Sequence, residues 1–123
     1  MASVVEGNVY VLFEVTLREG REDDFLARAA ALKELLAQEE EGFVRSERFS
    51  SLAVPRKLLS LSVWESEEAV ERWRNVVEHR ASQRAGRELD FEDYTITVAS
   101  PLRCYSISDR AQAPEDSDDA LGI

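Results

Sequence analysis

The sequence predicts a single α+β domain whose elements follow the order β-α-β-β-α-β. Two observations lead to this prediction. Four stretches of the chain alternate between apolar and polar side chains with a period of two, which is the period of a β-strand. Two longer stretches between them repeat their apolar residues every three or four positions, which is typical of an amphipathic helix. A chain of 123 residues is long enough to form one domain with its own core.

The first half of the chain contains two of the predicted strands and the first helix. Residues 8–18 form a strand with one strongly apolar face, made of Val9, Val11, Phe13, Val15 and Leu17. Residues 22–40 form the helix, whose apolar stripe is Phe25, Ala29, Leu32 and Leu36. Gly42 stands where a helix-ending residue is expected. Residues 43–52 form the second strand, in which strict alternation places on one face Phe43, Arg45, Glu47 and Phe49.

The second half of the chain repeats this scheme. Residues 57–64 form the third strand, with Leu59, Leu61 and Val63 on one face and Ser60, Ser62 and Trp64 on the other. Ser66 is a suitable cap for a second helix, which we expect to run from about Glu67 to about Arg84 and to end at Gly86. Residues 93–99 form the fourth strand. Pro101 interrupts the alternation, so residues 102–107 are expected as a short final strand or an arm.

This order of elements is the ferredoxin-like split βαβ arrangement. Two helices cover only one face of a four-stranded antiparallel sheet. The other face carries Tyr10, Leu12, Thr95, Thr97 and Ala99. We therefore predict a homodimer in which two sheets face each other and form a dimeric α/β barrel, with the arm after Pro101 in a position to cross to the partner.

Charge and composition exclude several functional classes. The chain has 25 acidic and 15 basic residues, a net charge of −10, which disfavours binding to nucleic acid and to anionic membranes. One cysteine and one histidine provide neither a disulfide nor a typical transition-metal site. No apolar run approaches the roughly 20 residues that span a bilayer, and residues 1–7 lack the pattern of a signal peptide. We therefore expect a cytoplasmic protein.

Residues 111–123 (AQAPEDSDDALGI) differ in composition from the rest of the chain. They contain four acidic residues, no basic residue and few large apolar side chains. Such a segment gains too little from burial to offset its ordering entropy. We therefore expect a single domain over residues 1–110, followed by an acidic and flexible C-terminal tail over residues 111–123.

Several residues along the middle of the chain resemble the antibiotic-biosynthesis-monooxygenase (ABM) family. The resemblance spans roughly Val9 to Tyr105. It rests on Gly42-Phe43, Glu47, Trp64-Glu65-Ser66, Ala69-Val70, Trp73 and His79. It implies a small dimeric α+β barrel of the ferredoxin-like type. The family includes cofactor-free oxygenases that act on electron-rich aromatic substrates, and also haem-degrading enzymes.

The resemblance favours the cofactor-free branch. Haem-degrading members use an Asn on the first strand, and a Trp and a His on the second helix. A gap-free match places Trp73 at the Trp, but Gln83 at the His and the neighbourhood of Phe13 at the Asn. Haem turnover is therefore disfavoured. We expect a cofactor-independent monooxygenase that acts on a small aromatic or quinol-type molecule with O₂, without a cofactor or a metal ion.

We expect the site between the sheet and the second helix. Asn75, His79 and Gln83 follow one another at intervals of four residues and so share one stripe of a continuous helix. His79 is the expected proton acceptor, because imidazole is suited to proton transfer near neutral pH. The other expected members are Asn75 and Gln83, which bind substrate oxygens, Arg80 or Arg87, which stabilise the substrate anion, and Trp73, Phe13 and Phe49, which shape the pocket.

Each of these residues also has a simpler interpretation. Trp73 lies on the apolar stripe of its helix and packs in the core on that basis. The arginines of this helix alternate with glutamates, so a solvated and ion-paired face accounts for them. A non-catalytic dimeric ligand-binding or structural module of the same fold is therefore the alternative function. The two functions predict different surroundings for His79: an enclosed pocket for the monooxygenase and solvent for the non-catalytic module.

Overall fold

The computed structural model describes residues 8–39 and 41–123. The elements that build the domain are β1 (Val9–Leu17), α1 (Glu22–Glu39), β2 (Phe43–Ser50), β3 (Lys57–Trp64), α2 (Glu67–Arg74), α3 (Val77–Ala85), the π-helical turn η1 (Gly86–Asp90) and β4 (Phe91–Ala99). A short helix, α4 (Glu115–Leu121), follows in the C-terminal segment. The predicted order of strands and helices is confirmed, with the second helix divided into α2 and α3. None of the helices in the described ranges is long and apolar enough to cross a bilayer.

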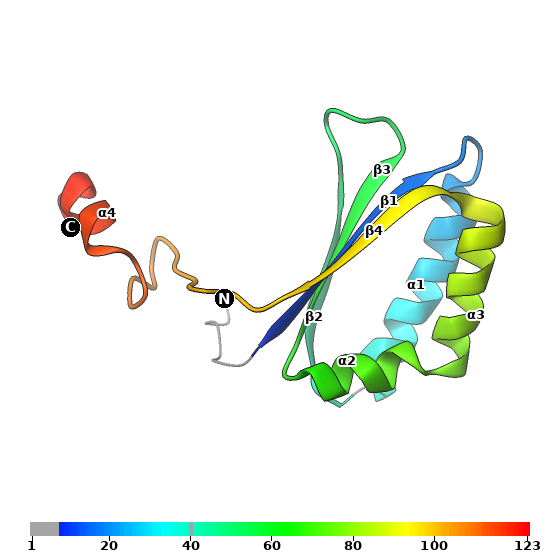
Figure 1. The fold of residues 1–123 in the computed structure, drawn as a ribbon, viewed down its shortest axis with the longest axis horizontal. Helices are drawn as coiled ribbons and strands as arrows, with labels where there is room; N and C mark the ends of the chain where they lie inside the picture. Colours follow the sequence, from blue (N-terminus) through cyan, green and yellow to red (C-terminus); the bar gives the residue numbers. More distant parts are fainter. Residues whose placement is uncertain (1–7, 40) are drawn as a thin grey trace.

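The four strands form one antiparallel sheet with the order β2-β3-β1-β4. Helices α1, α2 and α3 all lie against the same face of this sheet (Figure 1). We call it the covered face, and the opposite one the open face. The apolar side of β1 faces the helices, because Val15 and Leu17 are fully buried with Phe25 and Ala29 of α1. Tyr10 and Leu12 alternate onto the open face, as predicted.

The predicted second helix is interrupted at Asn75 and Val76. The backbone of Val76 is extended (φ −65°, ψ 134°), and the Asn75 side-chain amide donates to the Glu71 carbonyl at 3.0 Å, which ends α2. In Figure 1, α2 lies across one end of the sheet, whereas α3 turns to run beside α1. The expectation of one continuous helix from Glu67 to Arg84 is therefore wrong, because a β-branched residue in extended conformation ends its first part.

The end of α3 also differs from the sequence prediction. Gly86 has ordinary helical angles (φ −59°, ψ −52°) and begins η1 rather than ending the helix. Its role is steric, because a Cβ atom at this position would lie 2.2 Å from the ring of Phe91. The fourth strand then begins at Phe91, two residues before the predicted start at Asp93.

Two groups of buried residues form the core between the sheet and the helices. One lies where α1 begins and contains Val15, Leu17, Phe25 and Ala29, with Phe13, Phe91 and Tyr94 packed against it. The other lies near α2 and contains Leu36, Trp64, Ala69 and Trp73. Both groups are apolar, so burial of their side chains stabilises the attachment of the helices to the sheet.

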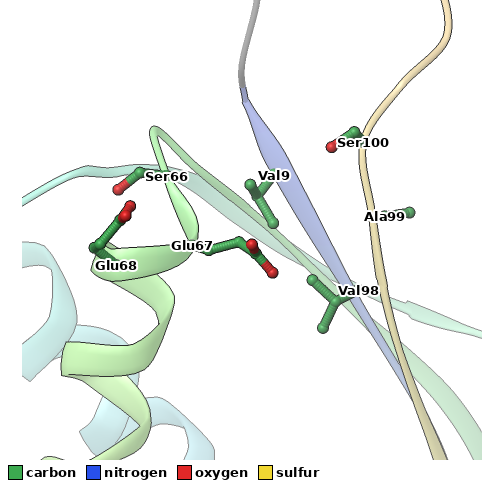
Figure 2. Close-up of a pocket in the computed structure, with 7 residues that line it drawn as sticks. All are labelled: Val9, Ser66, Glu67, Glu68, Val98, Ala99 and Ser100. Carbon is green, nitrogen blue, oxygen red and sulfur yellow. The ribbon is translucent and has the colours of Figure 1, made fainter.

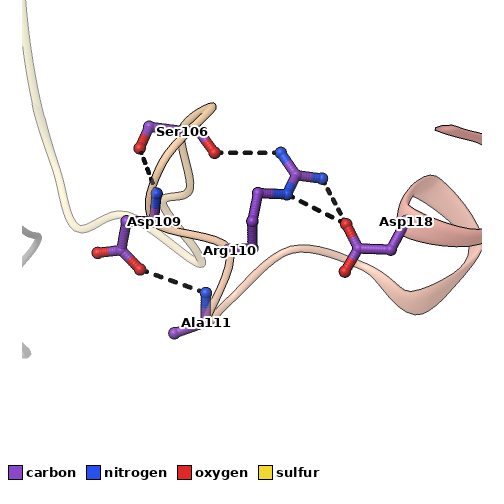
Figure 3. Close-up of polar contacts among 5 residues, drawn as sticks. All are labelled: Ser106, Asp109, Arg110, Ala111 and Asp118. Carbon is purple, nitrogen blue, oxygen red and sulfur yellow. Dashed lines mark hydrogen bonds and ion pairs between the residues drawn. The ribbon is translucent and has the colours of Figure 1, made fainter. Parts of the chain in front are cut away.

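Residues 100–123 form an arm that carries α4 away from the sheet (Figure 1). Residues 102–107 form no strand, so of the two expected conformations the arm is found. Arg110 holds its far part together: its guanidinium donates to Asp118 Oδ1 at 2.6 and 3.1 Å and to the Ser106 carbonyl at 3.2 Å (Figure 3). The acidic segment after residue 110 therefore contains local helical structure that composition did not predict, whereas its flexibility stays a prediction.

Candidate functional site

A cavity of about 500 Å³ lies between the covered face of the sheet and helices α1 and α3. This volume falls in the range of small-molecule sites. Its walls at one end are aromatic: the rings of Phe13, Phe91 and Tyr94 have centroids within 5.6 to 5.8 Å of one another. At the other end it is bounded by Trp64 and Trp73. Helix α3 contributes an imidazole, a guanidinium and an amide, from His79, Arg80 and Gln83.

The cavity exists because two strands present small polar residues to the helices. Ser46 of β2 and Ser60 and Ser62 of β3 all line it. Serine side chains are too short to fill the space that an apolar core residue would occupy. Ser62 also accepts a hydrogen bond from Trp64 Nε1 at 2.9 Å, which satisfies the polar atom of that fully buried ring.

His79 lies in the wall of this cavity, directly after the break between α2 and α3. Its ring centroid is 5.2 Å from that of Trp73. Burial lowers the pKa of the imidazole below its ordinary value, and the positive charges of Arg80 and Arg74 lower it further. A hydrogen bond from Nδ1 to the Arg74 carbonyl, at 3.4 Å, acts in the opposite direction and outweighs the effect of either arginine alone, but not that of burial. His79 is therefore neutral at physiological pH, with Nε2 as its acceptor atom.

Arg80 connects the two amides that the sequence placed in the site. Its guanidinium donates to Asn75 Oδ1 at 2.9 Å and to Gln83 Oε1 at 3.2 Å. Arg80 and Gln83 line the cavity, whereas Asn75 is exposed and does not. The expected stripe of three residues is therefore broken at Asn75, because α2 ends there. Arg87 also lines the cavity, with its guanidinium 5.8 Å from the centroid of the Tyr94 ring.

Of the three residues expected to shape the pocket, Trp73 and Phe13 line the cavity and Phe49 does not. The pairing of β2 with β3 shifts by one residue between Phe43 and Arg45, so strict alternation fails there. Phe43 consequently packs against Trp64 on the covered face, with a centroid distance of 5.4 Å. Phe49 lies on the open face with 41% of its surface exposed. Its assignment to the pocket is corrected on this ground.

Sequence reasoning missed Arg48, which lies on the covered face of β2 and lines the cavity. Its Nε donates to Ser60 Oγ at 3.1 Å, and its guanidinium is 5.7 Å from the centroid of the Phe25 ring. Burial lowers the pKa of this guanidinium from its ordinary value. The alternation of β2 indicated that Arg48 shares a face with Ser46 and that Phe49 lies on the other face. No recognised motif includes Arg48.

A second pocket, of about 410 Å³, lies where α2 begins beside the ends of β1 and β4 (Figure 2). It is lined by Val9, Ser66, Glu67, Glu68, Val98, Ala99 and Ser100. It contains no aromatic side chain and no cation, and Ser66 is engaged in capping the helix through a bond from Ala69 N at 3.2 Å. Its ionisable groups are the carboxylates of Glu67 and Glu68, whereas the imidazole and the guanidinium groups, which suit an anionic intermediate, line the larger cavity.

The larger cavity lacks the set of residues that the haem-degrading enzymes, considered in the sequence analysis, use to bind and degrade haem. Gln83 and Phe13 stand at or near the positions where those enzymes carry His and Asn, and both line the cavity. Neither side chain offers the ring nitrogen or the first-strand amide of that arrangement. The residues present therefore do not fit that use of haem.

Comparison with known proteins gives relatives by sequence and by fold. A jasmonate monooxygenase ABM of Pyricularia oryzae is 36% identical over 88 residues, which cover 72% of this chain and 40% of that protein. YqjZ, an uncharacterized protein of Bacillus subtilis, is 33% identical over 64 residues, 52% of this chain and 54% of that protein. The matched stretches thus span less than two thirds of either relative.

Solved structures share the fold at low sequence identity. Rv0793 from Mycobacterium tuberculosis has a TM-score of 0.72 at 19% identity, over 81% of this chain and 100% of that one. SnoaB from Streptomyces nogalater, a cofactor-independent oxygenase, has a TM-score of 0.69 at 17% identity, over 80% of this chain and 96% of that one. The sequence model of the antibiotic biosynthesis monooxygenases matches residues 8–85. This match covers more than half of the chain, and the chain therefore belongs to the antibiotic biosynthesis monooxygenase family.

Proposed function

We propose that this chain is a cofactor-independent monooxygenase that uses O₂ to oxidise a small, electron-rich aromatic or quinol-type molecule in the larger cavity. The observation that carries the proposal is His79, a neutral imidazole in the wall of a largely apolar cavity, next to Trp73 and Arg80. The named monooxygenase among the relatives supports the reaction class, not the choice of substrate.

The first step is proton removal from the substrate. His79 donates through Nδ1 to the Arg74 carbonyl, so the lone pair of Nε2 accepts a phenolic or activated C–H proton. Arg80, which Asn75 and Gln83 hold in place, carries the positive charge that stabilises the resulting anion. The aromatic walls cover the apolar part of the substrate, whereas Arg80 is exposed and approaches the anion from the solvent side of the cavity.

The second step is oxidation of the anion by O₂. An electron-rich carbanion transfers one electron to O₂, and the two radicals combine to form a C–O bond. Protonation of the peroxide, by the imidazolium of His79, gives a hydroperoxide. Loss of water from a CH–OOH carbon then leaves a carbonyl group, so that CH₂ and O₂ become C=O and H₂O. The protein's part is to deprotonate, to orient and to return the proton.

The alternative is a module that binds the same class of molecule without turnover. The partial exposure of His79, which is neither fully enclosed nor fully solvated, is the observation that favours it. Both alternatives use the same cavity, so a binding measurement alone does not separate them.

The open face of the sheet supports a homodimer as the working form of the protein. Leu12, Leu59 and Leu61 lie on this face, and none of the described helices covers it. Sheet faces of this kind are stabilised by packing against a second sheet. Light scattering should give about twice the chain mass of 13.9 kDa, and a mass near 13.9 kDa would contradict the dimer.

The test of the activity is O₂ consumption with a panel of phenols, quinols and anthrone-like compounds. We expect turnover by the wild-type protein and a loss of about 100-fold or more in kcat for His79→Gln, the usual range for removal of a general base. Arg84→Gln is the matched control, because Arg84 is an exposed arginine of α3 that does not line the cavity. Compounds that bind without O₂ consumption would favour the non-catalytic module, and a Soret band on titration with hemin would favour haem binding.

A further inference from the structure

We propose that the ligand of the larger cavity carries a carboxylate, and that Arg48 on β2 binds it. This inference rests on the proposed function only in using the same cavity; it concerns the class of ligand and not the reaction. It starts from a cation on the covered face of the sheet, at a position where the packing of the domain alone calls for an apolar or small residue.

The surroundings of Arg48 contain no compensating negative charge among the described side chains. It forms a hydrogen bond with the hydroxyl of Ser60 and a cation–π contact with the ring of Phe25. Some other cations of the described chain lie within ion-pair distance of a carboxylate, namely Arg21, Arg28, Arg56, Lys57 and Arg110. Arg80 and Arg87, which line the same cavity, are exposed to solvent. Arg48 is thus a half-buried cation with neutral neighbours, in contrast to these.

A half-buried arginine keeps its charge at neutral pH, because the guanidinium is so strongly basic that it stays protonated although burial lowers its pKa. Removing this charge from water is unfavourable unless an anion approaches it. A ligand with a carboxylate provides that anion. The cavity therefore favours an acid over a neutral molecule of the same shape.

The hydrogen bond to Ser60 fixes the orientation of the guanidinium. It engages Nε, which leaves the two terminal nitrogens for a ligand. These two nitrogens present parallel N–H groups, the geometry that matches both oxygens of a carboxylate. The ring of Phe25 further restricts the guanidinium through a cation–π contact. Arg48 is therefore oriented for such an anion before a ligand arrives.

The position of Arg48 also defines how a ligand lies. Arg48 belongs to the sheet wall of the cavity, whereas His79 and Arg80 belong to α3 on the opposite wall. A carboxylate bound at the sheet wall directs the remainder of the molecule toward α3. The aromatic rings of Phe13, Phe91 and Tyr94 then contact its apolar part. The ligand class is therefore an acid with an aromatic body, because aromatic rings line this part of the cavity.

Glu47 also borders the cavity, but its side chain is not a partner for Arg48. It neighbours Arg48 on the same strand, is exposed and pairs in register with Leu61 on the open face. Adjacent residues of a strand direct their side chains to opposite faces. Its carboxylate therefore does not neutralise the guanidinium within the cavity.

The test compares two molecules that differ only in charge, 2-naphthoate and 2-naphthamide, by calorimetric titration of the full chain. We expect the wild-type protein to bind the acid about tenfold or more tightly than the amide, as a charge-assisted bidentate contact requires. Arg48→Gln should bring the two affinities together while leaving that of the amide unchanged. Arg84→Gln should retain the full preference.

Three results would overturn the proposal: equal affinities in the wild type, a preference that survives in Arg48→Gln, or an equal loss of both affinities in that variant, which indicates a structural role. If Arg48→Gln does not fold, Arg48→Lys takes its place. It keeps the charge but loses the planar fork, so the preference should fall several-fold, and an unchanged preference contradicts the proposal.

These outcomes are independent of those for the monooxygenase. Selective binding of the acid without O₂ consumption by any acidic or neutral compound would leave the carboxylate site standing and remove the proposed reaction. Turnover of neutral quinols, together with equal affinities of the wild-type protein for the acid and the amide, would support the reaction and remove the carboxylate site.

Discussion

The Nδ1 atom of His79 lies 3.4 Å from the carbonyl oxygen of Arg74, the last residue of α2. Carbonyl groups at the end of a helix have no partner within the helix, so they accept hydrogen bonds from other donors. A carbonyl oxygen only accepts, and the proton of the neutral imidazole must therefore be on Nδ1. The break between α2 and α3 thus selects the tautomer in which Nε2 is basic.

The first prediction concerns the titration of His79. Burial lowers its pKa more than the hydrogen bond to the Arg74 carbonyl raises it, and the charges of Arg80 and Arg74 lower it further, so the midpoint should lie below the ordinary value of 6.5. The basic form is the active one in the proposed reaction, so kcat/KM should fall only as the pH drops through this lowered midpoint. His79 is the one histidine of the chain, so its imidazole proton resonance can be followed by NMR without assignment.

Substitution of Arg80 separates the effect of burial on the pKa of His79 from the effect of the neighbouring positive charge. Arg80→Gln should raise the midpoint only in part, because burial is the larger cause. Arg84→Gln, on the same helix but not among those causes, should leave it in place. A wild-type midpoint at or above 6.5 would contradict the neutral imidazole on which the proposed base depends.

The second prediction concerns the close approach of Gly86 and Phe91. A Cβ atom at residue 86 would lie 2.2 Å from the ring of Phe91, which packs against the rings of Phe13 and Phe25, so a shift of Phe91 disturbs these contacts. Gly86→Ala should therefore lower the free energy of unfolding by about 1–3 kcal/mol, the usual range for overpacking. Chemical denaturation measures this change.

A double variant identifies the cause of that loss. If the ring is responsible, Gly86→Ala combined with Phe91→Leu should lose less than the sum of the two single variants. An additive result would point to the backbone of η1 instead of the aromatic contact.

The sequence predicted the order and the faces of the elements because burial is periodic, but not the local departures from periodicity. The shift at Val44 places Phe43 and Phe49 on opposite faces of the sheet, although strict alternation places them on the same one. Nothing in the residue types marks this shift, since both faces of β2 contain polar and aromatic residues. The break at Val76 has the same character, because valine occurs within helices as well as in extended backbone. Both departures are decided by tertiary packing.

The third prediction concerns Asp90, whose side chain is fully buried between two arginines. It accepts from Arg21 Nε at 2.9 Å and forms an ion pair with Arg28, which joins the end of η1 to α1. Asp90→Ala leaves two cations without this partner, which typically costs about 3 kcal/mol or more for a buried pair. Both arginines are about one third exposed, so we expect a loss near the lower end of that range.

Asp24 provides the matched control for Asp90. It contacts the same Arg21, at 3.0 Å, but its side chain is 60% exposed. Asp24→Ala should therefore change the free energy of unfolding by about 1 kcal/mol or less, as expected for a surface pair. Urea denaturation measures both changes. Equal losses of unfolding free energy for the two substitutions would show that burial of Asp90 does not strengthen its ion pairs.

The sequence predicted members of the candidate site on the first strand, where Phe13 lines the cavity, and along the predicted second helix. Trp73, His79 and Gln83 belong to a stretch with recognisable family features, and all three line the cavity. Arg48 belongs to a strand in which a charged residue on either face is compatible with the pattern. Only the structure shows that its face is covered by helices, and that the serines beside it leave space for a ligand.

The last prediction decides which pocket binds the ligand. Ser46→Leu adds an apolar side chain to the wall of the larger cavity and should fill part of it, because Ser46 lines that cavity from β2. Filling an apolar space commonly stabilises a protein, so thermal denaturation should show an unchanged or raised Tm. The affinity for 2-naphthoate should nevertheless fall about tenfold or more, because the ligand and the new side chain compete for the same volume. Ser100→Leu, which alters the pocket at the start of α2, should leave the affinity unchanged. The opposite pattern would place ligand binding beside Glu67 and Glu68, where an acid is not expected to bind because both carboxylates repel it.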